Sequence, residues 1–260
     1  MQAVHRFDLP LGDEPGEPWR PFPAFRGPTR IVADMSCHAS VLAAGHSAHP
    51  PHAHDEEELL IPFHGEAELV IAADEDDRAP RAQRLAPGSF VFYPSGQYHT
   101  IRNPGTSPIA YLMFKWRAPA TDAAEPRLGT EIVSFDRFLG AAEPFRTELV
   151  LEGPTGCLRK LHSHLTVLRP GAGYEPHRDA HDVAIVLLEG TVETLDRAVE
   201  PLSVVYCSAG ELHGLRNVGT CPARYLVFEF HAPRTAASSP EPSLLSRVAS
   251  KLRRARARQP

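Results

Sequence analysis

The chain has 260 residues, of which 42% are hydrophobic and 23% charged, and its formal net charge is −5 at pH 7. These proportions are ordinary for a globular protein, and the length allows one or two domains. No apolar run approaches the twenty or so residues of a membrane-spanning helix, which excludes that class. The first residues lack the basic-then-apolar pattern of a signal peptide, so we expect a cytoplasmic protein.

Residues 1–29 are predicted to form an N-terminal extension rich in proline. The whole chain has 26 prolines, which exceeds the average usage of about one residue in twenty. Several of them lie in this extension, including Pro10, Pro15, Pro18, Pro21 and Pro23. Such usage favours many short strands joined by stiff turns, and we expect little helix.

Potential metal ligands follow one another in the next segment. His52, His54 and Glu58 occupy positions of the same parity, so in an extended strand their side chains project from one face. Imidazole suits zinc, copper, iron and nickel, and a carboxylate adds manganese, so the donors do not select one metal.

A fourth potential ligand, His99, lies some forty residues further along. It follows a strand-like run over 89–93 and a turn over 94–96 that reverses the chain. A neighbouring hairpin of this kind places His99 opposite the first three side chains. Four protein ligands on an octahedral ion would leave about two positions for substrate, dioxygen or water.

The residues around these ligands resemble the two motifs of the cupin superfamily. The first motif, with one extra residue before the histidine pair, is carried by Gly45, His52, His54, Glu58 and Gly65. The second is matched position for position by Gly88, Pro94, Gly96, His99 and Asn103. The resemblance implies a double-stranded β-helix, or jelly-roll barrel, over 30–118. It also implies one divalent cation (Fe, Mn, Zn or Ni) held by His52, His54, Glu58 and His99.

The chain then repeats itself, which predicts a second barrel. His52 and Gly65 correspond to His177 and Gly190, and His99 corresponds to His213. The second copy is shorter between the motifs, where the first carries a polar, loop-like stretch over 73–78. We therefore expect an all-β bicupin with two tandem jelly-roll barrels. Barrel 1 spans 30–118, a linker with lead-in strands spans 119–155, and barrel 2 spans 156–232.

The second copy differs at the ligand positions. It has His177, Asp179 and Val183 where the first copy has its ligands, and a valine cannot ligate a metal. Because His181 shares the parity of His177 and Asp179, an alternative set of His177, Asp179, His181 and His213 can be drawn. We expect this set to be a relic site whose polar residues form hydrogen bonds or line a pocket.

Two further features carry no assigned chemistry. His162 and His164 fall on the strand before the motif, because they align with the segment ending at His38, and we expect a structural role for them. The four cysteines show no paired metal spacing and are expected to be reduced thiols.

Residues 233–260 are predicted to be a linker followed by a short basic amphipathic helix or tail. Leu244, Leu245, Val248 and Leu252 fall on one helical face, and the opposite surface is basic. This pattern permits contact with an anionic membrane surface, an acidic partner or nucleic acid. Because the rest of the chain is acidic and lacks a basic groove, we expect no nucleic-acid binding. The sequence leaves open whether the protein forms a homodimer.

Cupins with this ligand set include dioxygenases, decarboxylases, isomerases and lyases, so the resemblance does not select the reaction. We expect a metal-dependent oxidoreductase, with dioxygenase-type chemistry on a small oxygenated substrate at barrel 1. Glu56, Tyr98 and Arg102 lie beside the ligands and are candidate catalytic residues that orient the substrate. One alternative is a metal-dependent isomerase, lyase or decarboxylase of a sugar or organic acid. Another is a bicupin that binds or senses a small molecule without turning it over.

Overall fold

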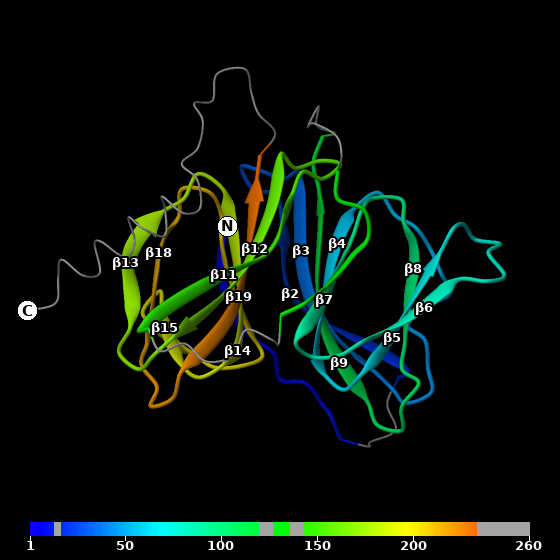
Figure 1. The fold of residues 1–260 in the computed structure, drawn as a ribbon, viewed down its shortest axis with the longest axis horizontal. Helices are drawn as coiled ribbons and strands as arrows, with labels where there is room; N and C mark the ends of the chain where they lie inside the picture. The colour runs from blue at the N-terminus through cyan, green and yellow to red at the C-terminus, as the bar shows by residue number, and fades with distance from the viewer. Residues whose placement is uncertain (13–16, 120–126, 136–142, 233–260) are drawn as a thin grey trace, which may run out of the picture. The chain divides into compact units, whose positions relative to one another are not determined.

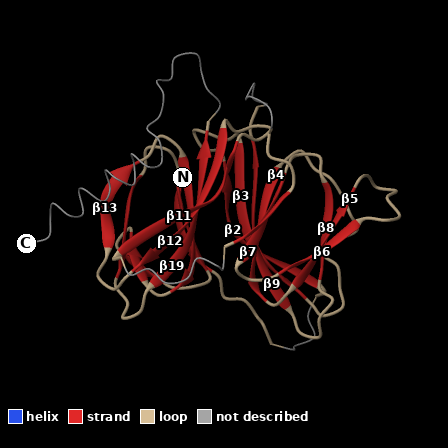
Figure 2. Ribbon diagram, in the orientation of Figure 1, coloured by secondary structure: helices blue, strands red, loops and turns tan. Residues whose placement is uncertain are grey.

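The computed structural model describes residues 1–12, 17–119, 127–135 and 143–232, and every helix or strand assigned within these ranges is a β-strand (Figure 2). The expected all-β fold is confirmed. Among these residues no helix has the length and hydropathy needed to cross a membrane. The predicted basic helix over 243–258 lies outside the described residues.

The chain divides into two compact units, which are described separately. The first barrel is formed by the described residues of Phe7–Arg137 and Gly153–Leu158. The second barrel is formed by the described residues of Met1–Arg6, Phe138–Glu152 and Arg159–Pro260.

The first barrel consists of two antiparallel sheets (Figure 1). The six-stranded sheet has the order β10-β7-β4-β9-β3-β2. Its strands are β2 (Trp19–Gly27), β3 (Asp34–Leu42), β4 (Glu57–His64), β7 (Ser89–Tyr93), β9 (Ile109–Arg117) and β10 (Glu131–Ser134). The three-stranded sheet has the order β6-β5-β8, with β5 (Ala67–Ala72), β6 (Arg81–Leu85) and β8 (Tyr98–Arg102). The consecutive strands β4 and β5 lie in different sheets, as do β7 and β8, so the chain crosses between the two sheets as in a jelly roll.

Apolar side chains from both sheets meet inside this barrel. Leu60 on β4, Leu69 on β5 and Val91 on β7 belong to one buried cluster, which excludes water from the space between the sheets. Gly65 makes the turn from β4 to β5 with φ at 73°, and a Cβ there would lie 2.7 Å from Cγ2 of Ile109. Both the backbone angle and the close approach therefore require glycine at this motif position.

The second barrel repeats this plan with a six-stranded and a four-stranded sheet (Figure 1). The first has the order β1-β17-β14-β19-β12-β11. Its strands are β1 (Gln2–Arg6), β11 (Phe145–Gly153), β12 (Lys160–Leu168), β14 (Asp182–Glu189), β17 (Ser203–Cys207) and β19 (Ala223–His231). The second has the order β13-β18-β15-β16, with β13 (Gly173–Arg178), β15 (Val192–Thr194), β16 (Arg197–Val199) and β18 (Leu212–Asn217).

A buried asparagine closes the same turn in both barrels. Asn103, which follows β8, donates from Nδ2 to the carbonyl of Leu42 at 3.0 Å and to that of Ser107 at 2.9 Å. Asn217, at the end of β18, donates from Nδ2 to the carbonyl of Leu168 at 2.9 Å. Because a buried amide must be paired, the asparagine of the second motif has a structural task in each repeat.

Edge strands of both barrels come from segments outside the predicted barrel ranges. β1, within the predicted N-terminal extension, pairs with β17 of the second barrel, and the N-terminal amine of Met1 donates to Ser208 Oγ at 2.7 Å. β2, from the same extension, pairs with β3 of the first barrel. β10, from the predicted linker, pairs with β7. Each sheet is thereby extended beyond its repeat.

Candidate metal centre

The first barrel contains a cavity of about 190 Å³. Its polar wall includes His49, His52, Glu58, His99 and Lys115. Its apolar wall includes Trp19, Leu60, Ile101, Tyr111 and Met113. Sites for drug-sized ligands measure roughly 300–1,000 Å³, so this cavity suits a small molecule.

Backbone hydrogen bonds join the first histidine segment to the turn that carries the second motif. The amides of His52 and His99 donate to each other's carbonyls, at 3.2 Å and 3.0 Å. The amide of Gly96 donates to the carbonyl of His54 at 2.9 Å, and Gly96 has φ at 79°. The tight turn therefore brings His99, on β8, beside a segment some forty residues earlier.

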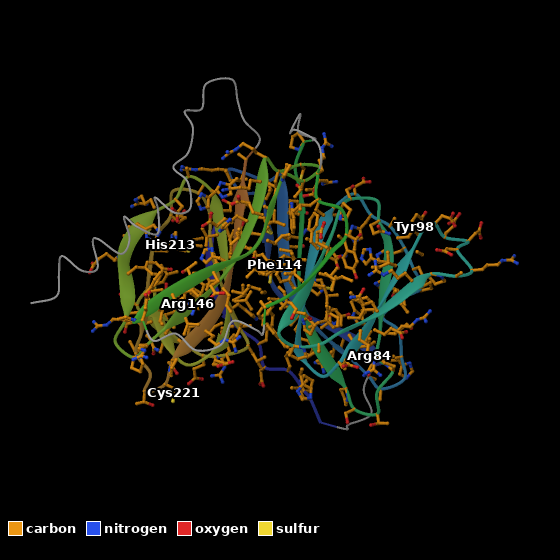
Figure 3. The ribbon with its side chains drawn as sticks, viewed as in Figure 1. Arg84, Tyr98, Phe114, Arg146, His213 and Cys221 are labelled. Atoms are coloured by element: carbon orange, nitrogen blue, oxygen red, sulfur yellow. The ribbon has the colours of Figure 1, made fainter. Side chains whose placement is uncertain are left out.

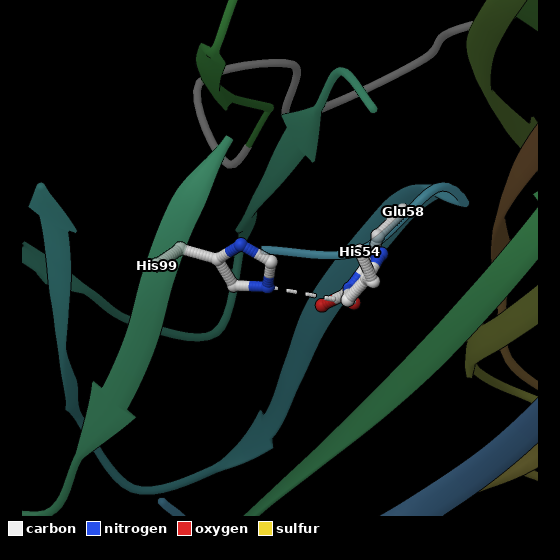
Figure 4. Close-up of side chains that lie close together, drawn as sticks. All are labelled: His54, Glu58 and His99. Atoms are coloured by element: carbon white, nitrogen blue, oxygen red, sulfur yellow. Dashed lines mark hydrogen bonds and ion pairs between the residues drawn. The ribbon is translucent and has the colours of Figure 1, made fainter. Parts of the chain in front are cut away.

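Two histidines converge on one carboxylate (Figure 4). Nε2 of His54 lies 3.1 Å from Oε2 of Glu58, and Nε2 of His99 lies 3.6 Å from the same oxygen. The donor atoms of all three residues lie within 4.8 Å of one another. Neighbouring ligands of one ion with bonds of about 2.1 Å are roughly 3–3.5 Å apart, so the set is compact enough to bind one cation.

The fourth predicted ligand, His52, lies beside this set. Its ring centroid is 5.4 Å from that of His54 and 5.4 Å from that of His99. It lines the cavity, and its Nδ1 is buried without a hydrogen-bond partner. Burial, followed by the positive charge of the neighbouring histidines and Lys115, lowers the pKa of His52 to about 4. The neutral ring can therefore offer a lone pair at pH 7.

Both converging histidines are oriented by backbone carbonyls. Nδ1 of His54 donates to the carbonyl of Glu56 at 3.0 Å, and Nδ1 of His99 donates to that of Gln97 at 2.8 Å. A proton on Nδ1 leaves the Nε2 lone pair directed at Glu58. The ring of His99 also stacks on Tyr93 at a centroid distance of 4.1 Å. This is the orientation that metal-ligating histidines require.

Glu58 is fully buried and charged. Burial raises its pKa, but contacts with His54, His99 and Lys115 outweigh that effect and hold the pKa well below its usual range. Its Oε1 is buried without a hydrogen-bond partner. An ionised carboxylate with an unsatisfied oxygen, facing histidine lone pairs, fits a divalent cation.

Lys115 is a site residue that sequence reasoning missed. Its Nζ lies 3.0 Å from Oε2 of Glu58 and 3.2 Å from Nε2 of His54. One signal was present, because Lys115 is the charged residue in the otherwise apolar run 109–116. That signal did not reveal the partner, which depends on the pairing of β4 with β9.

The three candidate catalytic residues lie in different surroundings. The carboxylate of Glu56 lies 3.5 Å from Nδ1 of His54, on the side away from Glu58. Tyr98 and Arg102 are not among the residues that line the cavity. Tyr98 lies on β8 next to His99 (Figure 3), and the exposed Arg102 has its guanidinium 3.7 Å from Glu68.

Comparison with known proteins agrees with this architecture. Residues 39–115 match the family model described as a cupin domain. The first barrel therefore contains a cupin domain. No curated protein sequence matches this chain significantly.

Solved structures share the fold over nearly the whole chain. A Pseudomonas aeruginosa protein, provisionally described as glyoxylate induced, matches at a TM-score of 0.64 and 15% identity, covering 94% of this chain and 92% of that chain. Protein Ylba from E. coli matches at 0.64 and 15% identity, covering 90% and 92%. A point mutant of the Bacillus subtilis oxalate decarboxylase matches at 0.60 and 15% identity, covering 90% and 78%.

The second barrel divides its predicted relic set between two groups. Nε2 of His177 and Nε2 of His213 lie 3.1 Å and 3.3 Å from Oδ2 of Asp179, and these donors form one group. His181 belongs instead to a group with Glu229 and His231. The shared parity of His181 with His177 and Asp179 therefore did not bring it to the same cluster, because it immediately precedes another strand, β14.

Proposed function

We propose that this cupin is a metal-dependent enzyme that acts on a small, anionic, oxygenated molecule in the first barrel, by dioxygenase-type chemistry. The observation that carries the proposal is the convergence of His54, Glu58 and His99, with Lys115 beside them in the wall of a small cavity. Two histidines and one carboxylate with open positions are the ligand set of non-haem iron oxygenases.

The residues that would hold the ion are His54, Glu58 and His99, with His52 as the fourth ligand. A divalent ion bound there would supply a Lewis acid and, if it were iron, a centre that activates dioxygen. The backbone carbonyls that accept from the two Nδ1 atoms keep both rings in position before substrate arrives.

Other cavity residues would bind and orient the substrate. The ammonium of Lys115 provides a positive charge for a carboxylate or enolate oxygen. Tyr93 also lines the cavity, and its buried hydroxyl has no hydrogen-bond partner. Burial, followed by the nearby charge of Glu58, raises the pKa of Tyr93 well above its usual range, so this hydroxyl stays protonated and can donate to the substrate. Leu60, Ile101 and Met113 contribute apolar surface to the same cavity.

A second candidate is a metal-dependent decarboxylase, isomerase or lyase of a small organic acid. The observation that favours it is Lys115, whose ammonium lines the cavity and can donate a proton to a bound substrate. Such a step needs no redox change. The oxalate decarboxylase named among the solved structures acts on a small acid and has the same fold. Both candidates use the same ligands and differ in their need for dioxygen.

Metal analysis combined with oxygen uptake would test the proposal. The purified chain would be loaded with Fe²⁺, Mn²⁺ or Zn²⁺ and offered a panel of two- to four-carbon carboxylic and hydroxy acids. Substrate-dependent oxygen consumption with the Fe²⁺ protein supports the dioxygenase, and product formation without oxygen supports the second candidate. In either case His54→Ala and Glu58→Ala should lose the first-barrel ion and activity together.

The matched control is Asp179→Ala in the second barrel, which is expected to keep the metal content and activity of the wild type. If the chain bound small acids tightly without any metal and without turnover, it would be a binding or sensing module and the proposed enzyme would be ruled out.

A further inference from the structure

A second group of metal-binding side chains lies in the second barrel at positions other than the cupin motif. Its members are His162, His164, His181, Glu229 and His231. Glu229 belongs to two sets of three donors, and within each set the donor atoms lie within 4.8 Å of one another. We propose that this group holds one divalent first-row transition-metal ion, such as Zn²⁺, centred on Glu229. The proposal does not depend on the function of the first barrel.

The register of the strands shows where the carboxylate of Glu229 lies compared with that of Glu58 in the first barrel. In the first barrel one row across the sheet reads Ser36 on β3, Lys115 on β9 and Glu58 on β4. The equivalent row in the second barrel reads His162 on β12, Glu229 on β19 and Val183 on β14. Directly paired residues face the same side of a sheet. The carboxylate is therefore displaced by one strand, about 4.8 Å, and a histidine has replaced a serine beside it.

The distances around Glu229 fit a closed ligand set. Oε2 of Glu229 lies 3.3 Å from Nε2 of His181 and 2.9 Å from Nε2 of His231. Ligands on a tetrahedral Zn²⁺ with bonds of about 2.0–2.1 Å are roughly 3.3 Å apart. The three side chains lie on or next to two neighbouring strands of the sheet. His181 immediately precedes β14, and Glu229 and His231 lie two residues apart on β19.

These side chains are buried, and one of them is unsatisfied. His181 is 2% exposed, Glu229 8% and His231 1%. Both ring nitrogens of His181 are buried without a hydrogen bond, although Nε2 is close to the carboxylate. A buried imidazole with two unsatisfied nitrogens is costly in a protein interior. A metal ion bound to one nitrogen would remove much of this cost.

His162 is held in the orientation of a metal ligand. Its Nδ1 donates to Oε2 of Glu152 at 2.7 Å, and the side chain of His162 is fully buried. Its Nε2 lone pair is thereby directed toward the group, 3.2 Å from Nδ1 of His164. A carboxylate that fixes the far nitrogen of a histidine is the usual support of a ligating imidazole. His162 is therefore the candidate for the fourth ligand.

The donor chemistry and the charge favour a transition metal over Ca²⁺ or Mg²⁺, because imidazoles outnumber carboxylates. Contacts with His181 and His231 outweigh the effect of burial and hold the pKa of Glu229 well below its usual range, so the carboxylate is ionised. A buried site of this kind is typical of structural zinc, which has no open position.

Metal stoichiometry of the full chain tests the inference. The protein would be stripped with a chelator, dialysed against Zn²⁺ or Co²⁺, and analysed for metal per chain, with the visible Co²⁺ spectrum as a second readout. We expect Glu229→Gln to lose one equivalent of metal, together with the Co²⁺ bands of that equivalent. Glu58→Gln, the matched variant in the first barrel, should leave this equivalent in place.

Two further variants keep the result decisive. If Glu229→Gln fails to fold, His181→Gln and His231→Gln are expected to lose the same equivalent and the rise in melting temperature that Zn²⁺ confers on the wild type. Asp179→Asn should retain both. Loss of the ion from Asp179→Asn with retention in Glu229→Gln would assign it to the motif positions and overturn the inference. Metal loading that none of the Glu229, His181 and His231 variants reduces would overturn it as well.

Discussion

Glu58 on β4 is paired directly with Lys115 on β9, and the lysine ammonium lies 3.0 Å from the buried carboxylate. The first barrel therefore places a protein cation beside the carboxylate that its cupin motif provides for a metal. The lysine ammonium and a metal ion bound at this site would favour the same ionised state of Glu58. In the second barrel the equivalent pair is Val183 and Glu229, so neither the lysine nor the motif carboxylate is kept.

Lys115→Met should destabilise the metal-free protein. Without the ammonium, Glu58 is a buried charge that depends on its histidines, and removal of one partner of a buried ion pair costs about 3 kcal/mol. Lys115 is partly exposed (23%), so about 2 kcal/mol is a fair expectation after screening by solvent. Urea unfolding in the presence of a chelator would measure the loss, and saturating Zn²⁺ or Mn²⁺ should restore most of it.

The control for Lys115→Met is Arg84→Met in the same barrel. Arg84 pairs with Glu66 at 3.0 Å on the surface, where both side chains are exposed, and an exposed pair contributes about 0–1 kcal/mol. Equal losses in the two variants would mean that Lys115 is not the counter-ion of a buried charge.

Glu57→Ala should also destabilise the first barrel, although Glu57 is not a site residue. Its buried carboxylate accepts hydrogen bonds from Trp116 Nε1 at 2.9 Å, Thr155 Oγ1 at 2.7 Å and the amide of Cys157 at 3.2 Å. Loss of the acceptor leaves several buried donors unpaired, at a cost of about 3 kcal/mol in unfolding free energy. Asp55→Ala, at an exposed position, should change it by less than about 0.5 kcal/mol. Similar unfolding midpoints for the two variants would contradict this account.

The strands and the converging ligands could be predicted because their signals are local. His54 and Glu58 lie four residues apart, at positions of the same parity. His99 lies some forty residues further along and directly follows a short turn that the sequence also indicates. Lys115 and Glu229 carry no such signal. Their partners lie on strands far away in the chain, so only the register of β4 with β9 and of β14 with β19 reveals the contact.

The sheet positions of the edge strands could not be predicted for a similar reason. β1 pairs with β17, and Gln2 lies opposite Cys207 across most of the length of the chain. A five-residue strand has little periodicity of its own, and no rule of local sequence assigns it to one barrel or the other. Repeat matching locates the common core of each barrel, but it misses edge strands such as β1 and β10, which hold equivalent sheet positions and come from different places in the chain order.

Thiol labelling should distinguish one cysteine from the other three. Cys37, Cys157 and Cys207 are buried, whereas Cys221 is exposed at the edge of the second barrel (Figure 3). We expect one thiol per chain to react rapidly with Ellman's reagent at pH 8 in the folded protein and four to react in urea. Cys221→Ser should abolish the rapid phase. A second rapid thiol in the folded protein would show that one of the buried strands opens readily.

Cys207 should make the stability of the second barrel depend on alkaline pH. Burial raises the pKa of this thiol to about 11, while an unfolded thiol has a pKa of about 8.5. Between these values the folded chain keeps a proton that the unfolded chain has lost. The unfolding free energy therefore falls as pH rises, by at most about 1.4 kcal/mol per pH unit from this group.

Cys207→Val removes the titrating group and keeps an apolar side chain of similar size in the core. Urea unfolding at pH 8, 9 and 10 should give a shallower decline for this variant than for the wild type, because over this range the wild-type thiol loses its proton in the unfolded state alone. Cys221→Ser is the control and should keep the wild-type decline, since its side chain is exposed in the folded chain. If the wild type and Cys207→Val declined in parallel from pH 8 to 10, the thiol of Cys207 would not be shielded from water as its burial in β17 indicates.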